Sequence, residues 1–231
     1  MTRRINPFAC CVLLTLGLAG TLSAQTVPPA NKDQEAKLIA VLKSEAPLKE
    51  KADACRGLSL IGTKESIAPL AALLGDEKVS HLARIGLEPI PDPGVDEALR
   101  DALGKLKGRP LIGVIGSLGV RRDSKAVGPL SGLLKDADAD TAQAAARALG
   151  RIGDKAAAEA LEAALENVPA ANRLAISEGL FRCADRLVAS GKTPEALAIC
   201  DKLNQPDSPP QVRESAMRKA RFLRLEPGPV L

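Results

Sequence analysis

The sequence predicts an all-α fold, an α-solenoid of about six antiparallel helix pairs, and three observations lead to this prediction. The 231-residue chain is rich in strong helix formers such as alanine and leucine, with three Phe, no Tyr and no Trp. Leucines recur with a period of about 31 residues, and a second apolar column repeats with a similar period. Because two independent columns share one period, the chain is a repeat protein.

The N-terminal segment, residues 1–24, has the features of a secretory signal peptide. Arg3 and Arg4 form a short positive start, and residues 8–22 follow as an uncharged apolar stretch of 15 residues. This stretch is shorter than the roughly 20 apolar residues that a membrane-spanning helix needs. We therefore expect cleavage after Ala24 and export through the Sec pathway, with the protein periplasmic or secreted and not stably inserted in a membrane.

The rest of the chain is expected to divide into a flexible lead-in at 25–31, a repeat region at 32–225 and an irregular tail at 226–231. Loss of the signal segment removes two arginines and lowers the formal net charge from +4 to +2. A charge this close to zero gives no reason to expect nucleic acid as a partner.

The first apolar column marks the first helix of each pair. Its members are Leu38, Leu70, Leu99, Leu130, Leu161 and Leu197. In the first five copies a second leucine lies four residues later, on the same helical face. These are Leu42, Leu74, Leu103, Leu134 and Leu165.

The second column marks the second helix of each pair. Its members are Leu58, Leu87, Ile115, Leu149 and Leu180, with Ala220 as the candidate in the last pair. Three residues later come Ile61, Ile90, Leu118, Ile152 and Cys183, with Leu223 in the last pair. One helix pair cannot bury its apolar stripe alone, so stability must come from stacking on neighbouring pairs.

Turn residues support the same division. Gly62, Gly119 and Gly153 are predicted to close second helices. Asp136, Asp138 and Asp140 crowd a short turn, where a carboxylate can cap the amides of the next helix.

The stretch AQAAARALGRIGD at 142–154, together with the preceding LLKDADAD, resembles a HEAT repeat, including the subgroup named after phycobilisome lyases. The resemblance covers about residues 35–225 and is strongest at 126–165. It implies a right-handed superhelix whose second helices line a concave face, and it implies no common reaction. Lys51 and Ala142 stand where the family usually has an arginine early in the second helix.

The chain offers little catalytic equipment. His81 is the sole histidine, and no aspartate or cysteine stands beside it, so we expect no enzyme and no His-rich metal site. The aspartates at 136, 138 and 140 superficially resemble a calcium loop, but Thr141 and Arg147 replace the glycine and glutamate that such a loop requires. We predict no catalytic residue, no metal and no cofactor.

Glycines and cysteines remain. Gly113, Gly116 and Gly119 recur every three residues, which favours close approach of another helix at that face. A partner contact at the same face is the alternative. Cys183 and Cys200 fall on helices expected to be antiparallel neighbours, so a disulfide between them is possible. Cys55 is expected to be a small buried residue.

Arginine dominates the candidate binding positions. Exposed positions of second helices supply Arg56, His81, Arg84, Arg147, Arg151, Arg173 and Arg182, and the end of the third pair adds Arg121 and Arg122.

These features predict an exported, non-catalytic protein-binding or scaffold module. Its partner is a protein of unknown identity, and an acidic surface on that partner is one option. The alternatives are a structural segment of an envelope assembly or longer repeat array, and a tetrapyrrole lyase-like protein.

Overall fold

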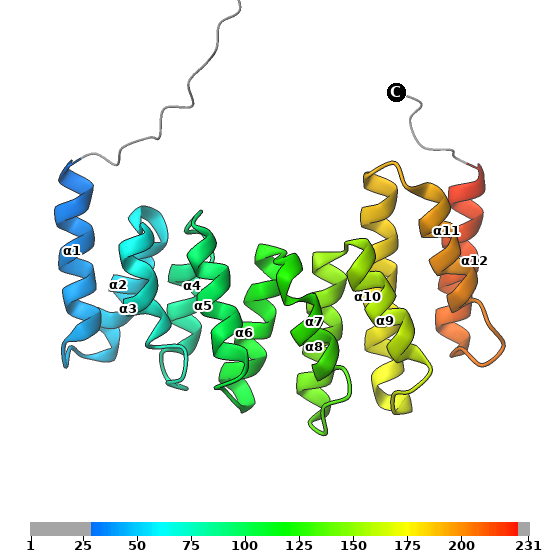
Figure 1. Cartoon of the computed structure of the whole chain (residues 1–231), viewed down its shortest axis with the longest axis horizontal. Coiled ribbons are helices and arrows are strands. Elements are labelled where there is room, and N and C mark those ends of the chain that lie inside the picture. Colours follow the sequence, from blue (N-terminus) through cyan, green and yellow to red (C-terminus); the bar gives the residue numbers. More distant parts are fainter. Residues whose placement is uncertain (1–28, 226–231) are drawn as a thin grey trace, which may run out of the picture.

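Residues 29–225 form a row of six helix pairs in the computed structural model (Figure 1). This part of the chain contains no β-strand. The first helices of the pairs are α1 (Pro29–Lys43), α3 (Ile67–Ala71), α5 (Pro93–Leu103), α7 (Val127–Leu133), α9 (Lys155–Leu165) and α11 (Thr193–Leu203). The second helices are α2 (Leu48–Ile61), α4 (Ser80–Leu87), α6 (Gly108–Arg121), α8 (Ala139–Ile152), α10 (Ala170–Ala189) and α12 (Pro210–Leu225).

The predicted α-solenoid is confirmed. Two short 3₁₀ turns, η1 (Lys64–Ser66) and η2 (Ser124–Ala126), lead into α3 and α7. The predicted signal segment at 1–24, residues 25–28 of the predicted lead-in and the predicted tail at 226–231 lie outside the described residues. Residues 29–31, predicted as part of the flexible lead-in, instead form the first turn of α1.

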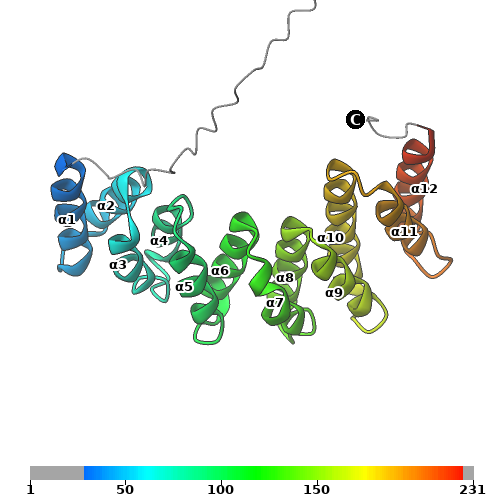
Figure 2. The same ribbon diagram turned by 45° about the horizontal axis from the view of Figure 1, so that its top comes forward.

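The pairs follow an arc, and the second helices occupy its inner side (Figure 2). Consecutive second helices contact one another without interruption from α2 to α10. First helices contact one another less, as expected on the outer and therefore longer side of a curved stack. The inner, concave face of the solenoid is thus built from second helices.

The core runs along the whole solenoid and follows the predicted columns. The middle copies of the first column, Leu70, Leu99, Leu130 and Leu161, are fully buried. The end copies, Leu38 and Leu197, are only partly buried, because each terminal pair has a neighbour on one side only.

Small residues on the second helices receive these leucines. A Cβ atom at Gly86 would lie 2.8 Å from Leu70 Cδ2, and one at Gly179 would lie 3.0 Å from Leu161 Cδ1. Gly57 stands in the same relation to Leu38, at 2.7 Å. The first-helix leucine therefore packs directly on the second-helix backbone.

A column of capping residues fixes the register of the repeat. These residues follow the second helices and cap the next helix with their side-chain oxygen: Thr63, Asp92, Asp123 and Asp154. Each stands five residues after a buried leucine, and in the third pair that leucine is Leu118. The prediction of Ile115 as the equivalent residue was therefore one helical turn too early, although Ile115 is also fully buried.

The predicted helix ends were right at two of three glycines. Gly62 and Gly153 are C-caps, and Gly153 has a left-handed φ of 64°. Gly119 lies inside α6, which continues to Arg121 and is capped by Arg122 with a φ of 56°. At the opposite end of α8, Asp138 caps the helix by accepting hydrogen bonds from the amide and hydroxyl of Thr141, as predicted for the aspartate turn.

Candidate functional site

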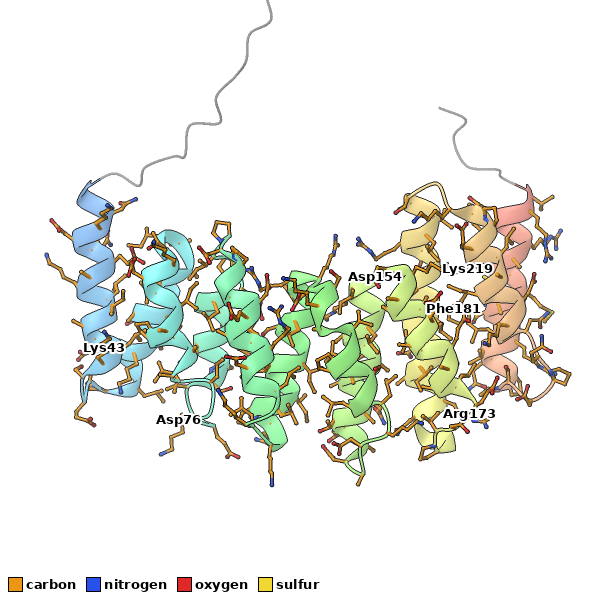
Figure 3. The ribbon with its side chains drawn as sticks, viewed as in Figure 1. Lys43, Asp76, Asp154, Arg173, Phe181 and Lys219 are labelled. Carbon is orange, nitrogen blue, oxygen red and sulfur yellow. The ribbon has the colours of Figure 1, made fainter. Side chains whose placement is uncertain are left out.

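Four arginines from three consecutive second helices line one hollow toward the C-terminal ends of these helices. Arg122 caps α6, Arg151 lies in the last turn of α8, and Arg182 and Arg186 lie on α10. The hollow has a volume of about 360 Å³. Its other lining residues are Gly119, Val120, Gly150 and Asp185. In Figure 3, Asp154 lies in the turn just after α8, close to the end of α8 that carries Arg151, and Lys219 lies on α12, where it pairs with Asp185 of the lining.

The repeat and its glycines bring these arginines together. Arg151 and Arg182 are 31 residues apart, so stacking places them at equivalent positions of adjacent helices. A Cβ at Gly150 would lie 2.7 Å from the Cα of Gly179, and one at Gly119 would lie 2.8 Å from the Cα of Ala148. Because these positions lack side chains, α6, α8 and α10 approach closely and the floor of the hollow is bare backbone.

Gly153 has a separate role, because it leaves room for the side chain of Arg186. A Cβ at Gly153 would lie only 2.2 Å from Arg186 Cδ. The aliphatic part of Arg186 therefore lies against the turn that ends α8, and any larger residue at 153 would displace it.

The hollow carries uncompensated positive charge. None of its four arginines forms an ion pair with another residue in the range 29–225. The acidic residue in the wall, Asp185, is already paired with Lys219. Guanidinium groups present a planar fork of N–H donors that matches carboxylate and phosphate oxygens, so the arrangement is suited to binding an anion.

Helix geometry accounts for part of this arginine enrichment. The carbonyl ends of helices favour cations, and Arg122, Arg151 and Arg186 all stand in or directly after a last helical turn. Arg182 lies one turn earlier on α10. The clustering itself follows from the stacking of α6, α8 and α10, with α10 extending beyond the end of α8.

Other predicted surface residues lie elsewhere on second helices. Arg56, His81 and Arg147 are exposed, and Arg56 pairs with Asp53 at 2.5 Å on its own helix. Arg173 lines a smaller hollow of about 90 Å³ near the turn after α11, at the opposite edge from Asp154 in Figure 3. A binding role for any of these residues stays a prediction.

Arg84 is partly covered. Its guanidinium packs over Gly113, where a Cβ would lie 2.6 Å from Arg84 Nε, and it approaches Glu88 at 3.9 Å. Its Nε is buried and has no hydrogen-bond partner among the described residues.

Arg121 is a structural residue, which corrects its prediction as a surface binding residue. Its side chain is only 12% exposed and forms an ion pair with Asp96 on α5. It also donates hydrogen bonds to the carbonyl oxygens of Glu88 and Ile90 at 2.8 Å and of Asp92 at 3.2 Å. In the corrected register Arg121 stands where the neighbouring pairs have Ile90 and Ile152. Its charge is therefore paired inside the protein and does not face a partner.

The three glycines of α6 do not share one packing role, contrary to the prediction. Gly119 faces the backbone of α8, Gly113 lies under Arg84, and a Cβ at Gly116 would meet no atom within 4 Å. Close helix approach therefore depends on Gly119 alone among the three.

All three cysteines of the described chain are buried free thiols. Burial raises the pKa of Cys183 to about 12 and that of Cys55 to about 11, and it also raises the pKa of Cys200. The possible Cys183–Cys200 bridge is not formed in this structure and stays a prediction for oxidising conditions.

Neither metal-binding clusters nor membrane spans occur in residues 29–225. No three His, Cys, Asp or Glu side chains there are grouped so that they could hold a metal ion. None of the described helices combines the length and apolar character needed to cross a bilayer.

Sequence reasoning missed Arg186 and the glycine floor. Arg186 follows Arg182 by one helical turn on the same helix. Gly119 and Gly150 are 31 residues apart, which is the repeat period. Aligning the repeats on their capping residues would have revealed the two glycines, which each lie four residues before a capping aspartate.

Residues 97–180 match the family described as HEAT repeats. This stretch extends from α5 into α10 and contains most of the hollow. Comparison with curated proteins finds no similar sequence. Among solved structures, an engineered protein from the Northeast Structural Genomics Consortium is 18% identical, with a TM-score of 0.49, and the alignment covers 83% of this chain and 97% of that one.

Proposed function

We propose that this protein is an exported, non-catalytic module that binds a protein partner along the inner face of its solenoid. The HEAT repeats at 97–180 support a binding or scaffold role. The observation that carries the proposal is the hollow formed by α6, α8 and α10, where four arginines have no ion-pair partner among residues 29–225. Export rests on the features of residues 1–24 in the sequence.

The inner face of α8 shows how the helix divides its residues between folding and binding. Between Thr141 and Ile152 every residue except Gln143, Arg147 and Arg151 is buried, and the helix packs against α6, α7, α9 and α10. Arg147 and Arg151, one turn apart, are the exposed residues of its C-terminal half. Since buried residues already hold the stack together, these two are free to contact a partner, and arginine is enriched at protein interfaces.

Affinity capture with the mature chain, residues 25–231, tests this function. The variant Arg147→Glu with Arg151→Glu reverses the charge of the inner face, and we expect it to lose proteins that the wild type captures from the envelope fraction. The matched control is Lys107→Glu with Arg109→Glu, which makes the same change in charge at exposed positions at the start of α6. Equal capture by wild type and both variants would contradict binding through the inner face.

A second candidate function, a segment of a larger assembly, is favoured by the last helix. On α12 the side chains of Met217, Phe222 and Leu225 are 52%, 56% and 69% exposed. Apolar residues at the open end of a stack can pack on another repeat. If this holds, light scattering should show concentration-dependent self-association that Met217→Lys with Phe222→Lys abolishes, whereas a monomer at all concentrations contradicts it.

A further inference from the structure

We propose that the arginine hollow binds an acidic segment of the partner protein, so that the partner is selected by its carboxylates. This inference rests on the proposed protein-binding function and names the chemistry that the site recognises. It concerns the hollow defined by Arg122, Arg151, Arg182 and Arg186.

The hydrogen-bonding state of the four guanidinium groups supports this assignment. Within residues 29–225 they neither form ion pairs nor donate side-chain hydrogen bonds, whereas neighbouring Arg121 uses its donors on Asp96 and three carbonyl oxygens. The four groups therefore keep their full donor capacity for a ligand.

The charges of the residues that line the hollow also favour an acidic ligand. Asp185 is the acidic residue of the lining, and its ion pair with Lys219 offsets its charge. Several positive charges face a small volume, so a group with several carboxylates gains more than a single anion does. Guanidinium and carboxylate groups match each other as paired donors and acceptors.

The size and lining of the hollow favour a peptide over a nucleic acid. A volume of about 360 Å³ lies at the lower end of sites that hold small ligands or a few side chains, roughly 300–1,000 Å³. The lining contains no aromatic ring on which a base could stack. It does include Val120, which is 49% exposed and can contact the aliphatic part of a bound peptide.

Fluorescence anisotropy with a fluorescein-labelled hexaglutamate peptide tests the proposal on the mature chain. We expect saturable binding that weakens as salt is added, because exposed charges are screened. Arg151→Gln with Arg182→Gln should weaken binding by about tenfold or more, since two charge-assisted contacts are removed. Lys107→Gln with Arg109→Gln makes the same change in charge away from the hollow and should leave the affinity within about twofold.

A second variant is expected to raise the affinity of the hollow for hexaglutamate. Asp185→Asn removes the acidic group from the wall and should tighten hexaglutamate binding by a few fold. Circular dichroism and thermal melting of each variant establish that it is folded. Because Asp185→Asn predicts a gain, loss of folding in another variant cannot imitate the expected result.

Three outcomes would overturn the proposal. One is that the Arg151→Gln, Arg182→Gln variant and its Lys107→Gln, Arg109→Gln control lose equal affinity for hexaglutamate, which would mean that the peptide binds by overall charge. Another is unchanged hexaglutamate affinity in the Arg151→Gln, Arg182→Gln variant, which would place the binding site elsewhere. The third is displacement of the peptide by oligodeoxythymidine or heparin at lower concentration than by unlabelled hexaglutamate, which would assign the hollow to another class of polyanion.

The inference and the proposed function can fail separately. If hexaglutamate does not bind while protein capture still depends on Arg147 and Arg151, the acidic-segment proposal fails and the binding function stands. If hexaglutamate binds at the hollow but no captured protein depends on the inner face, the protein-binding function fails, and the acidic-segment proposal fails with it.

Discussion

Arg121 and Arg122 are adjacent in the sequence and do opposite things in the structure. Arg121 points into the protein and holds the end of α6 to α5 through Asp96. Arg122 adopts the left-handed conformation that ends α6 and turns its side chain toward the hollow. One residue of difference along a helix end thus separates a structural arginine from a candidate binding arginine.

Charge reversal should separate these roles. Arg121→Glu places a carboxylate beside Asp96 and leaves three carbonyl oxygens without their donor, so we expect a loss of about 3 kcal/mol or more in the free energy of unfolding. Arg122→Glu changes an exposed residue and should alter it by about 0.5 kcal/mol or less. Urea denaturation followed by circular dichroism measures both, and equal effects would contradict this division.

The buried cysteines predict how stability changes at alkaline pH. The usual thiol pKa is 9.0, and burial raises it to about 12 for Cys183 and about 11 for Cys55 in the folded protein. Above pH 9 the unfolded chain therefore releases protons that the folded protein retains, and the free energy of unfolding falls as pH rises. The loss reaches up to about 1.4 kcal/mol per pH unit for each thiol.

Urea midpoints measured between pH 8 and pH 10 check this dependence. Replacing Cys183 with alanine lowers stability at every pH but should reduce the slope above pH 9. An unchanged slope in Cys183→Ala would show that this thiol titrates at its usual pKa in the folded protein.

At the scale of elements, the close stacking of α6, α8 and α10 is what assembles the candidate site. Gly119 and Gly150 permit this approach because their neighbours are backbone atoms less than 3 Å from where a Cβ would stand. A flexible side chain could move away, but a packed helix backbone cannot do so without shifting the whole pair. The same glycines therefore serve packing and, by leaving the floor bare, the shape of the hollow.

Two glycine-to-alanine substitutions test this packing. Gly150→Ala should destabilise the protein by about 1–3 kcal/mol, because the added methyl group overpacks the contact with α10. Gly116→Ala is the matched control, since it lies in a helix with nothing within 4 Å of the added atom. It should stabilise the protein by about 0.5–1 kcal/mol through helix propensity. Thermal melting compares them, and a stabilising Gly150→Ala would contradict the packing argument.

The whole molecule is stabilised pair by pair. Each pair buries its leucines against its own second helix and the neighbouring pairs, and the two end copies of the first column are the less buried ones. Local contacts of this kind make the ends open more readily than the middle.

Removal of α12, residues 210–225, should therefore loosen the C-terminal end first. Its removal uncovers the neighbouring helix α11, whose residues Ile199, Cys200 and Leu203 are buried in the intact protein. Hydrogen exchange followed by mass spectrometry should show loss of protection in α11 and the end of α10, with α4 to α6 unchanged. Uniform loss of protection along the chain would indicate one cooperative core instead.

The sequence by itself determined the fold class, the number of pairs and most of the core. Leu70, Leu99, Leu130 and Leu161 could be predicted as buried because helical periodicity and the repeat period are both readable along the chain. The exposed state of Arg147 and Arg151 followed from the same pattern.

Tertiary structure alone decided which arginines meet and which are buried. A register error of one helical turn in the third pair concealed that Arg121 occupies the position held by Ile90 and Ile152 in the neighbouring pairs. The gathering of Arg122, Arg151, Arg182 and Arg186 depends on how closely α6, α8 and α10 stack, and on contacts such as that between Gly153 and Arg186. Side-chain direction at a helix end follows from contacts with residues about 30 positions away, and the helical period does not encode those contacts.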